Sequence, residues 1–229
     1  MSHIEGATDC TDVTVFDIAA SFGSTGSATD VQMHLNNGGT ILTLANSAKN
    51  SRHGECVTFT ATLRASNRLS SQPSPTGVIT FRDGATVLKS FPLNGGQVNF
   101  STSKLAAGTH SITAVYSGDV HYNPHASAVL KQVVKKALTT IELVSSKPST
   151  TPQNVTFTAT VGSSTGAAPT GTVTFKDGSA TLGTASLISG KATVSTAGLE
   201  KGSHLIAVVY AGDSNFEGSV SPVLTQVVN

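Results

Sequence analysis

The sequence predicts an all-β protein that contains one module twice, each copy a sandwich of two antiparallel sheets. A set of motifs occurs twice in the same order, and apolar and polar residues alternate over short runs. Turn signals recur at roughly 8–12-residue spacing, as in sandwiches and barrels. No window keeps the period of about 3.6 residues that an amphipathic helix requires. These patterns indicate strands and turns throughout the chain.

The repeat is defined by four motifs. They are VTFTAT at 57–62 and 155–160, PTGVITFRDG at 75–84 with PTGTVTFKDG at 169–178, VYSGD at 115–119 with VYAGD at 209–213, and QVV at 132–134 and 226–228. The offset is 98 residues at the first motif and 94 residues at the others. We therefore divide the chain into an N-terminal extension at 1–39, a first domain at 40–136 and a second domain at 137–229.

The second copy shows the expected strands most clearly. Val155, Phe157 and Ala159 alternate with threonines, so one face of this strand is apolar and the other polar. The strand at 203–211 is apolar on both faces, which favours a central position in its sheet. We expect strands near 139–146, 154–162, 170–176, 180–188, 191–197, 203–211 and 222–228.

Two turn motifs occur in each copy, at equivalent positions. Asp83-Gly84 and Asp177-Gly178 each follow an apolar strand and predict hairpin turns, because glycine accepts the positive φ of such turns. Gly118-Asp119 and Gly212-Asp213 predict the bend between the sixth and seventh strands. Seven short strands in each copy of about 92 residues favour a β-sandwich of the immunoglobulin type.

The joint motif set resembles the bacterial Ig-like domain repeats of secreted and surface proteins. The set is P-T-G-x-V/I-T-F-x-D-G, G-x-H-x-I/L, V-Y-x-G-D-x-x-Y/F and a final Q-V-V, and it covers about four-fifths of the chain. The resemblance implies an extracellular or cell-surface segment with a structural or adhesive role. It implies a protein or surface-glycan partner only through the parent protein.

The motifs of catalysis and cofactor binding are missing from the sequence. There is no G-x-S-x-G, H-E-x-x-H, P-loop or dinucleotide fingerprint. We therefore expect no enzymatic activity, no catalytic residue and no cofactor. The run from Asp213 to Gly218 begins like a calcium loop, but Leu224 stands where the bidentate glutamate is needed. We interpret this run as a turn and expect no metal.

Two matched pairs of polar residues have structural interpretations. His110 and His204 occupy equivalent positions at the start of the sixth strand, which favours packing or hydrogen bonding over a ligand role. Tyr116 and Tyr210 end the same strand and are typical of a structural tyrosine whose hydroxyl is bonded, as in the tyrosine corner.

The chain has two cysteines. Cys56 opens the second strand of the first copy, and no cysteine lies near Tyr116 or Tyr210, so the inter-sheet disulfide of antibody domains is absent. We predict a Cys10–Cys56 disulfide that fastens the N-terminal segment to the first domain. Two free thiols are the alternative.

The N-terminal extension has three parts. Residues 1–6 lack the pattern of a signal peptide; Ile4-Glu5-Gly6 is typical of a cleavable tag, and a native start at Met1 is the alternative. Residues 11–20 form an apolar, β-rich run that we expect to dock on the first domain as an extra strand. Addition to a neighbouring molecule is the alternative. Residues 21–30 are typical of a flexible loop.

Charge and length exclude two further classes of function. The formal net charge is +1 without a Lys/Arg cluster, so we expect no nucleic-acid partner. No apolar run approaches the ~18 residues that cross a bilayer, so we expect no membrane insertion.

The leading hypothesis is a non-enzymatic stalk or spacer, monomeric in isolation. The copies are joined at 133–140 without glycine or proline, which limits bending. The alternative is a virion or filament subunit that binds neighbours through its N-terminal strand. A carbohydrate-binding module ranks lower, because the chain has no Trp and three Tyr.

Overall fold

The computed structural model describes residues 39–66, 73–146 and 154–229. Every regular element in these residues is a β-strand, which confirms the predicted fold class. Within them, no helix is long and apolar enough to cross a bilayer. The predicted strand at 11–20 and Cys10 lie outside the described residues.

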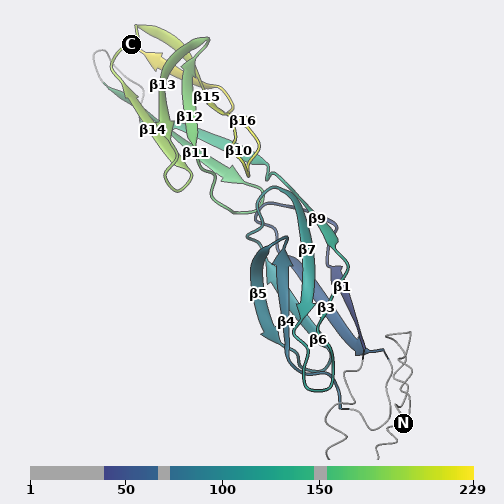
Figure 1. The fold of residues 1–229 in the computed structure, drawn as a ribbon. Helices are drawn as coiled ribbons and strands as arrows, with labels where there is room; N and C mark the ends of the chain where they lie inside the picture. Colours follow the sequence, from purple (N-terminus) through teal and green to yellow (C-terminus); the bar gives the residue numbers. More distant parts are fainter. Residues whose placement is uncertain (1–38, 67–72, 147–153) are drawn as a thin grey trace, which may run out of the picture. The chain divides into compact units, whose positions relative to one another are not determined.

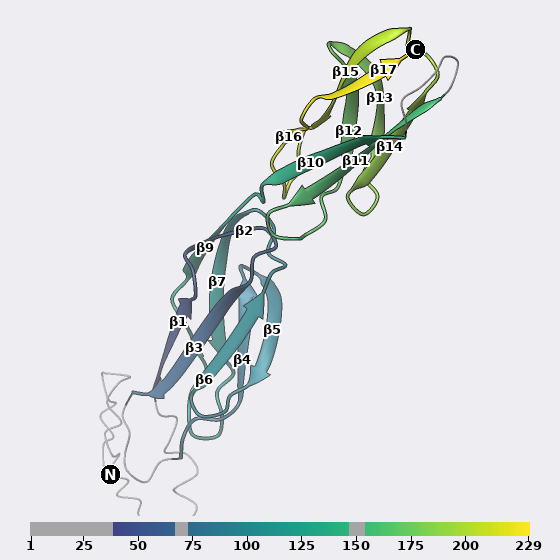
Figure 2. The same ribbon diagram turned by 180° about the vertical axis from the view of Figure 1, so that it is seen from behind.

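The first module is built from two sheets. Figure 1 views it from its larger sheet, and Figure 2 views it from the smaller one. The smaller sheet has the order β1-β3-β6, and the larger has the order β2-β9-β7-β4-β5, with β8 paired to β7. The strands are β1 (Thr40–Asn46), β2 (Asn50–Arg52), β3 (Val57–Ala65), β4 (Val78–Asp83), β5 (Thr86–Pro92), β6 (Gln97–Thr102), β7 (Gly108–Tyr116), β8 (His125–Ala126) and β9 (Leu130–Lys135).

The second module repeats this arrangement. Its smaller sheet has the order β10-β11-β14, and its larger sheet has the order β13-β12-β15-β16, with β17 also paired to β15. The strands are β10 (Thr139–Ser145), β11 (Val155–Ser163), β12 (Thr172–Asp177), β13 (Ala180–Ser186), β14 (Lys191–Thr196), β15 (Gly202–Tyr210), β16 (Ser219–Val220) and β17 (Leu224–Val228).

The core of the second module follows the alternation in the sequence. Val155, Phe157, Ala159 and Val161 on β11 are buried, with their threonine neighbours on the other face. One of those threonines, Thr156, shares a 2.7 Å hydrogen bond with a serine hydroxyl on β14. The outer face of β11 is therefore polar, while its inner face belongs to the core of the second module.

The predicted central strand corresponds to β15. It pairs with β12 on one side and with β16 and β17 on the other, so its central position is confirmed. Only one of its apolar faces is in the core, however. Ile206, Val208 and Tyr210 are buried, whereas Leu205 is 55% exposed. The outer face of this sheet is open to solvent, which the apolar pattern alone does not reveal.

Three short strands were not among the seven predicted for each copy. β2 is three residues long and pairs in parallel with β9. β8 and β16 are two residues long and pair with the ends of β7 and β15. Two residues carry no periodicity, so a pattern search cannot find them. The last strand also begins two residues later than predicted, at Leu224.

The hairpin turns lie where the sequence places them. Asp83 pairs with Thr86 and Asp177 pairs with Ala180, which leaves two-residue loops that begin at Gly84 and Gly178. Both glycines have positive φ, 54° and 57°. Glycine at the first loop position is the signature of a type II′ turn, whose twist matches that of the flanking strands.

Glycine is needed for a different reason in the turn after β15. Gly212 has a φ of 83°, and a Cβ atom there would lie 2.7 Å from the carbonyl oxygen of Phe216. A Cβ atom at Gly178 would meet nothing within 4 Å. A side chain at position 212 is disfavoured by the backbone conformation and by steric overlap, whereas one at position 178 is disfavoured by the conformation alone.

We predict that Gly212→Ala lowers the free energy of unfolding of the second module by about 3 kcal/mol or more. Gly178→Ala, the matched control, should cost only about 1 kcal/mol, because it adds φ strain without a clash. Denaturant unfolding of the full chain measures both. Equal losses would show that the turn after β15 relaxes around a side chain.

Candidate functional site

A polar cluster of the second module surrounds the carboxylate of Asp213, which accepts four hydrogen bonds. One oxygen accepts hydrogen bonds from the backbone N–H groups of Asn215 (2.7 Å) and Phe216 (2.9 Å). The other accepts from the backbone N–H and the hydroxyl of Thr170, just before β12. A single side chain thus ties the turn after β15 to the segment that leads into β12. We call this arrangement the Asp clamp.

The first module builds the same clamp with Asp119. Its carboxylate accepts from the N–H groups of His121 (2.7 Å) and Tyr122 (2.9 Å), and from the N–H (2.7 Å) and hydroxyl (2.9 Å) of Thr76. Burial alone would raise the pKa of Asp119, but the hydrogen bonds outweigh it and hold this pKa below its usual range. The same balance lowers the pKa of Asp213.

The clamp geometry bears on the calcium-like run at Asp213–Gly218. Both carboxylate oxygens of Asp213 are already taken by protein N–H and O–H donors. The described residues contain no group of three or more His, Cys, Asp or Glu side chains that could hold a metal ion. The run therefore has the contacts of a turn between strands.

A buried tyrosine lies beside each clamp, but only one has the predicted hydroxyl bond. Tyr210 donates to the carbonyl oxygen of Thr170 at 2.8 Å. Burial, with the charge of Asp213, raises the pKa of Tyr210 to about 12. The hydroxyl of Tyr116 is buried without a hydrogen-bond partner among the described residues. The described residues thus give the Tyr116 hydroxyl no hydrogen bond to a backbone carbonyl like that of Tyr210, although the Asp119 carboxylate lies near enough to affect its pKa.

The difference between Tyr116 and Tyr210 is explained by the residue six positions after each of them. Tyr122, where the second module has Phe216, donates its hydroxyl to the carbonyl oxygen of Pro73 at 2.8 Å. The tether to the segment before β4 therefore comes from Tyr122 in one copy and from Tyr210 in the other. Burial raises the pKa of Tyr116 well above its usual range, and the nearby charge of Asp119 adds to this effect.

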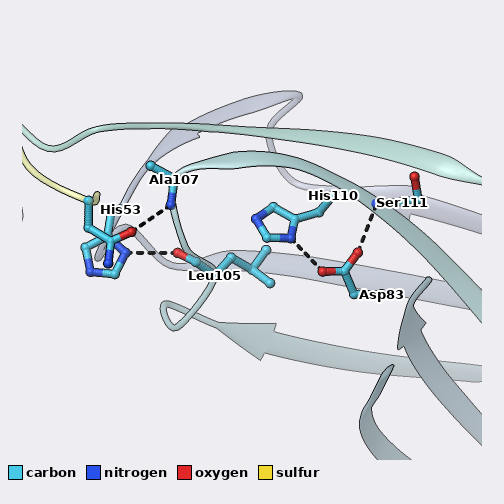
Figure 3. Close-up of polar contacts among 7 residues, drawn as sticks. His53, Asp83, Leu105, Ala107, His110 and Ser111 are labelled. Carbon is cyan, nitrogen blue, oxygen red and sulfur yellow. Dashed lines mark hydrogen bonds and ion pairs between the residues drawn. The ribbon is translucent and has the colours of Figure 1, made fainter. Parts of the chain in front are cut away.

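A second polar cluster joins the hairpin to the start of the sixth strand. In the first module, Asp83 lies 2.6 Å from Nδ1 of His110 and accepts the N–H of Ser111 at 3.0 Å (Figure 3). In the second module, Asp177 makes the same contacts with His204 (2.6 Å) and the N–H of Leu205 (3.0 Å). The aspartate of each Asp-Gly turn therefore serves a partner 27 residues away. We call this arrangement the His–Asp clamp.

The contacts of His204 determine its charge state. Nε2 lies 2.8 Å from the carbonyl oxygen of Glu200, which can only accept, while Nδ1 faces the carboxylate of Asp177. Both ring nitrogens must donate to satisfy both contacts, and only the imidazolium does so. The carbonyl of Glu200 and the carboxylate of Asp177 accordingly raise the pKa of His204 above its usual value.

Some buried polar residues were not singled out from the sequence. The hydroxyls of Ser127 and Ser221 accept the N–H groups of Ala114 and Val208, each at 3.0 Å. They close the sheet where β7 and β15 leave a backbone donor without a strand partner. Their recurrence at the offset of 94 residues was the available signal.

Another unpredicted contact involves His53 in the first module. Its Nδ1 lies 2.9 Å from the carbonyl oxygen of Leu105, in the loop between β6 and β7 (Figure 3). This histidine has no counterpart in the repeat motifs, so no repeated pattern marks it.

The predicted disulfide is only half described. Cys56 is exposed and immediately precedes β3. Cys10 lies outside the described residues, so the Cys10–Cys56 pairing stays a prediction.

The geometry of the two clamps is that of a fixed framework. Each clamp carboxylate accepts backbone N–H groups and ties two segments that are distant in sequence. The arrangement can hold loops in place and fix the charge of His204. The same clamps, turns and buried strand faces recur in both modules.

The model for the bacterial Ig-like domain (group 3) matches residues 42–135 and again residues 143–229. The chain belongs to this family. The comparison with curated proteins finds no match.

Solved structures that resemble the chain share little sequence with it. The adhesin InvE of Yersinia pseudotuberculosis is 16% identical, with a TM-score of 0.39, over 81% of this chain and 58% of that one. The Escherichia coli adhesin FdeC is 15% identical, with a TM-score of 0.32, over 83% and 64%. The fibronectin(III)-like modules of Clostridium thermocellum CbhA are 18% identical, with a TM-score of 0.34, over 42% and 96%.

The His–Asp clamp predicts a pH-dependent contribution to stability. A histidine whose pKa is raised on folding stabilises the fold fully below its unfolded value of about 6.5, and this contribution is lost as the pH rises through the folded value. His204→Asn should therefore cost more free energy of unfolding at pH 5.5 than at pH 8.5. His125→Asn, at an exposed site, is the control for the loss of a histidine outside the His–Asp clamp. A pH-independent cost at His204 would mean that folding does not raise the pKa of this ring.

The two tyrosines provide a matched pair of substitutions. Tyr210→Phe removes a hydroxyl that donates to a carbonyl, so it should cost the second module about 1 kcal/mol. Tyr116→Phe removes a buried hydroxyl without a partner, so it should leave the first module as stable or more stable. Calorimetry of the full chain measures both changes. A loss at Tyr116 equal to that at Tyr210 would reveal a hydrogen bond there.

Proposed function

We propose that this chain is a non-enzymatic segment of a bacterial extracellular or cell-surface protein, in which the paired modules act as a semi-rigid spacer or adhesion stalk. The observation that carries the proposal is the tandem repeat itself. The family model matches twice in succession, and only residues 136–138 separate β9 from β10. A spacer needs successive modules with a short connection between them, and the tandem match and the three intervening residues support this role.

Part of the connection between β9 and β10 belongs to the fold of the second module. Ala137 is fully buried in the core of the second module. Its N–H donates to the carbonyl oxygen of Asn215, and its own carbonyl accepts the N–H of Glu217, each at 2.9 Å. These contacts make Ala137 part of the second module, so the chain has few residues left to act as a hinge.

The burial of the tyrosines disfavours a carbohydrate-binding module. All three tyrosines are buried, with exposures of 0% for Tyr116, 2% for Tyr122 and 1% for Tyr210. The chain has no Trp. Sugar rings stack on exposed aromatic faces, and no tyrosine provides one.

Small-angle X-ray scattering tests the spacer role. We expect the full chain to give a maximum dimension close to twice that of one module, because residues 136–138 are too few to let the modules fold back. A variant with Gly-Gly-Ser-Gly-Gly-Ser inserted after Lys136 is the control, and should give a broader and more compact distribution. If the native chain is already as compact as this variant, the spacer proposal is wrong.

A further inference from the structure

The formal net charge of +1 is the sum of parts with opposite charge. Residues 1–39 contain five Asp and Glu and no Lys or Arg. Residues 40–136 contain ten Lys and Arg but only three Asp and Glu, whereas residues 137–229 contain four and five. The N-terminal segment is thus acidic and the first module basic, while the second module is nearly neutral.

The acidic residues of the first module have partners already. Asp83 and Asp119 are held in the two clamps, and Glu55 accepts the backbone N–H of Arg52 at 2.7 Å. The ion pairs among the described residues are those of the two His–Asp clamps. The exposed ammonium group of Lys89 on β5 therefore has no carboxylate partner in the described part of the chain.

β5 is also a free edge. It is the last strand of its sheet and pairs with β4 on one side only, so the groups on its other edge have no strand partner among the described residues. Val87 is 52% exposed on this strand. Phe91 is only half-buried, with its ring 6.1 Å from that of Phe100. Such an edge is a template for a further strand.

The second module lacks these features at the matching edge. β13 carries Thr181, Gly183 and Ala185 where β5 carries Val87, Lys89 and Phe91. The apolar and basic character of the edge is therefore particular to the first module. It is not a requirement of the fold.

We propose that residues 9–20 of the same chain add as a strand to the free edge of β5. This segment combines Val13, Val15, Phe16 and Ile18 with three aspartates, at positions 9, 12 and 17. The bulge between β4 and β5 places Val87 on one face of β5 and Lys89 with Phe91 on the other. The apolar side chains of the segment match Val87 on the first face and Phe91 on the second, and its carboxylates match Lys89. Opposite charges on neighbouring strands stabilise the pair.

The length of chain between the segment and the first module permits this contact. Residues 21–39 can span up to about 65 Å when extended. A nine-residue strand such as β7 is only about 30 Å long, so the segment can reach any edge of its own module. Attachment to the same chain also gives a local concentration in the millimolar range.

Charge distinguishes this occupant from a second copy of the chain. If β5 strands of two copies paired, each Lys89 would face another basic edge, without a carboxylate to offset the repulsion. The acidic segment removes that repulsion instead. The edge therefore favours residues 9–20 over self-association.

Hydrogen exchange measured by mass spectrometry tests the proposal on the full chain and on a chain that lacks residues 1–20. We expect amides of residues 85–93 to exchange at least about tenfold faster after the deletion. Residues 180–187, on the matching strand of the second module, should be unaffected. Measurements with and without reductant separate strand addition from the predicted Cys10–Cys56 link.

Charge reversal then tests the contact itself. Lys89→Glu in the full chain should speed exchange of residues 85–93 about fivefold, since it replaces an attraction by a repulsion. Lys191→Glu, at an exposed position of β14, is the matched control and should have no effect there. In the deleted chain, Lys89→Glu should also have no effect. A synthetic peptide of residues 9–20 should restore protection to the deleted chain, and its Asp12→Asn, Asp17→Asn form should restore less.

Two results would overturn the proposal. If exchange at residues 85–93 is the same with and without residues 1–20, β5 is not the docking edge. If protection rises with protein concentration and sedimentation shows dimers that the deletion abolishes, the segment joins neighbouring molecules instead.

Discussion

Each module has to hold two small sheets face to face without the disulfide that joins the sheets of antibody domains, since no cysteine lies near Tyr116 or Tyr210. Burial of alternate side chains therefore provides the main attraction between the sheets. In the second module Phe157, Phe175 and Tyr210 are almost fully buried at this interface. Burying a side chain of this size contributes roughly 1.5–3 kcal/mol before ordering costs. The other contacts act on a pair of sheets that the core already holds together.

The clamps extend this order to the loops. A loop that only crosses the end of a sandwich gains little from the core, because few of its side chains are buried. The carboxylates of Asp119 and Asp213 overcome this by accepting four hydrogen bonds each, from segments 43 residues apart in sequence. Hydrogen bonds to a charged acceptor are stronger than neutral ones. The lowered pKa values of these two aspartates reflect the same contacts.

The sequence predicted the strands well, because alternation is a local property that the core requires. It also placed Asp83-Gly84 and Asp177-Gly178 at hairpins, since the residue types report the backbone conformation directly. It could not predict that these aspartates reach His110 and His204, because 27 residues separate the partners and only the fold brings them together. The equivalence of Tyr116 and Tyr210 failed for a related reason: the hydroxyl tether depends on whether Tyr or Phe stands six residues later.

Comparing the two copies distinguishes features that the fold requires from features that occur in one module only. The clamps and the buried strand faces recur at a fixed offset, so they reflect the stability of the sandwich. Features that occur once and lie on the surface are not explained in this way. The basic charge of residues 40–136 and the apolar edge at Val87 and Phe91 belong to this class, and so does the acidic N-terminal segment. Opposite charges on one chain attract at any concentration, whereas a partner in solution must be present in excess to compete. A contact specific to this protein is therefore to be sought first at the edge of β5, where unrepeated charge and unrepeated apolar surface lie together.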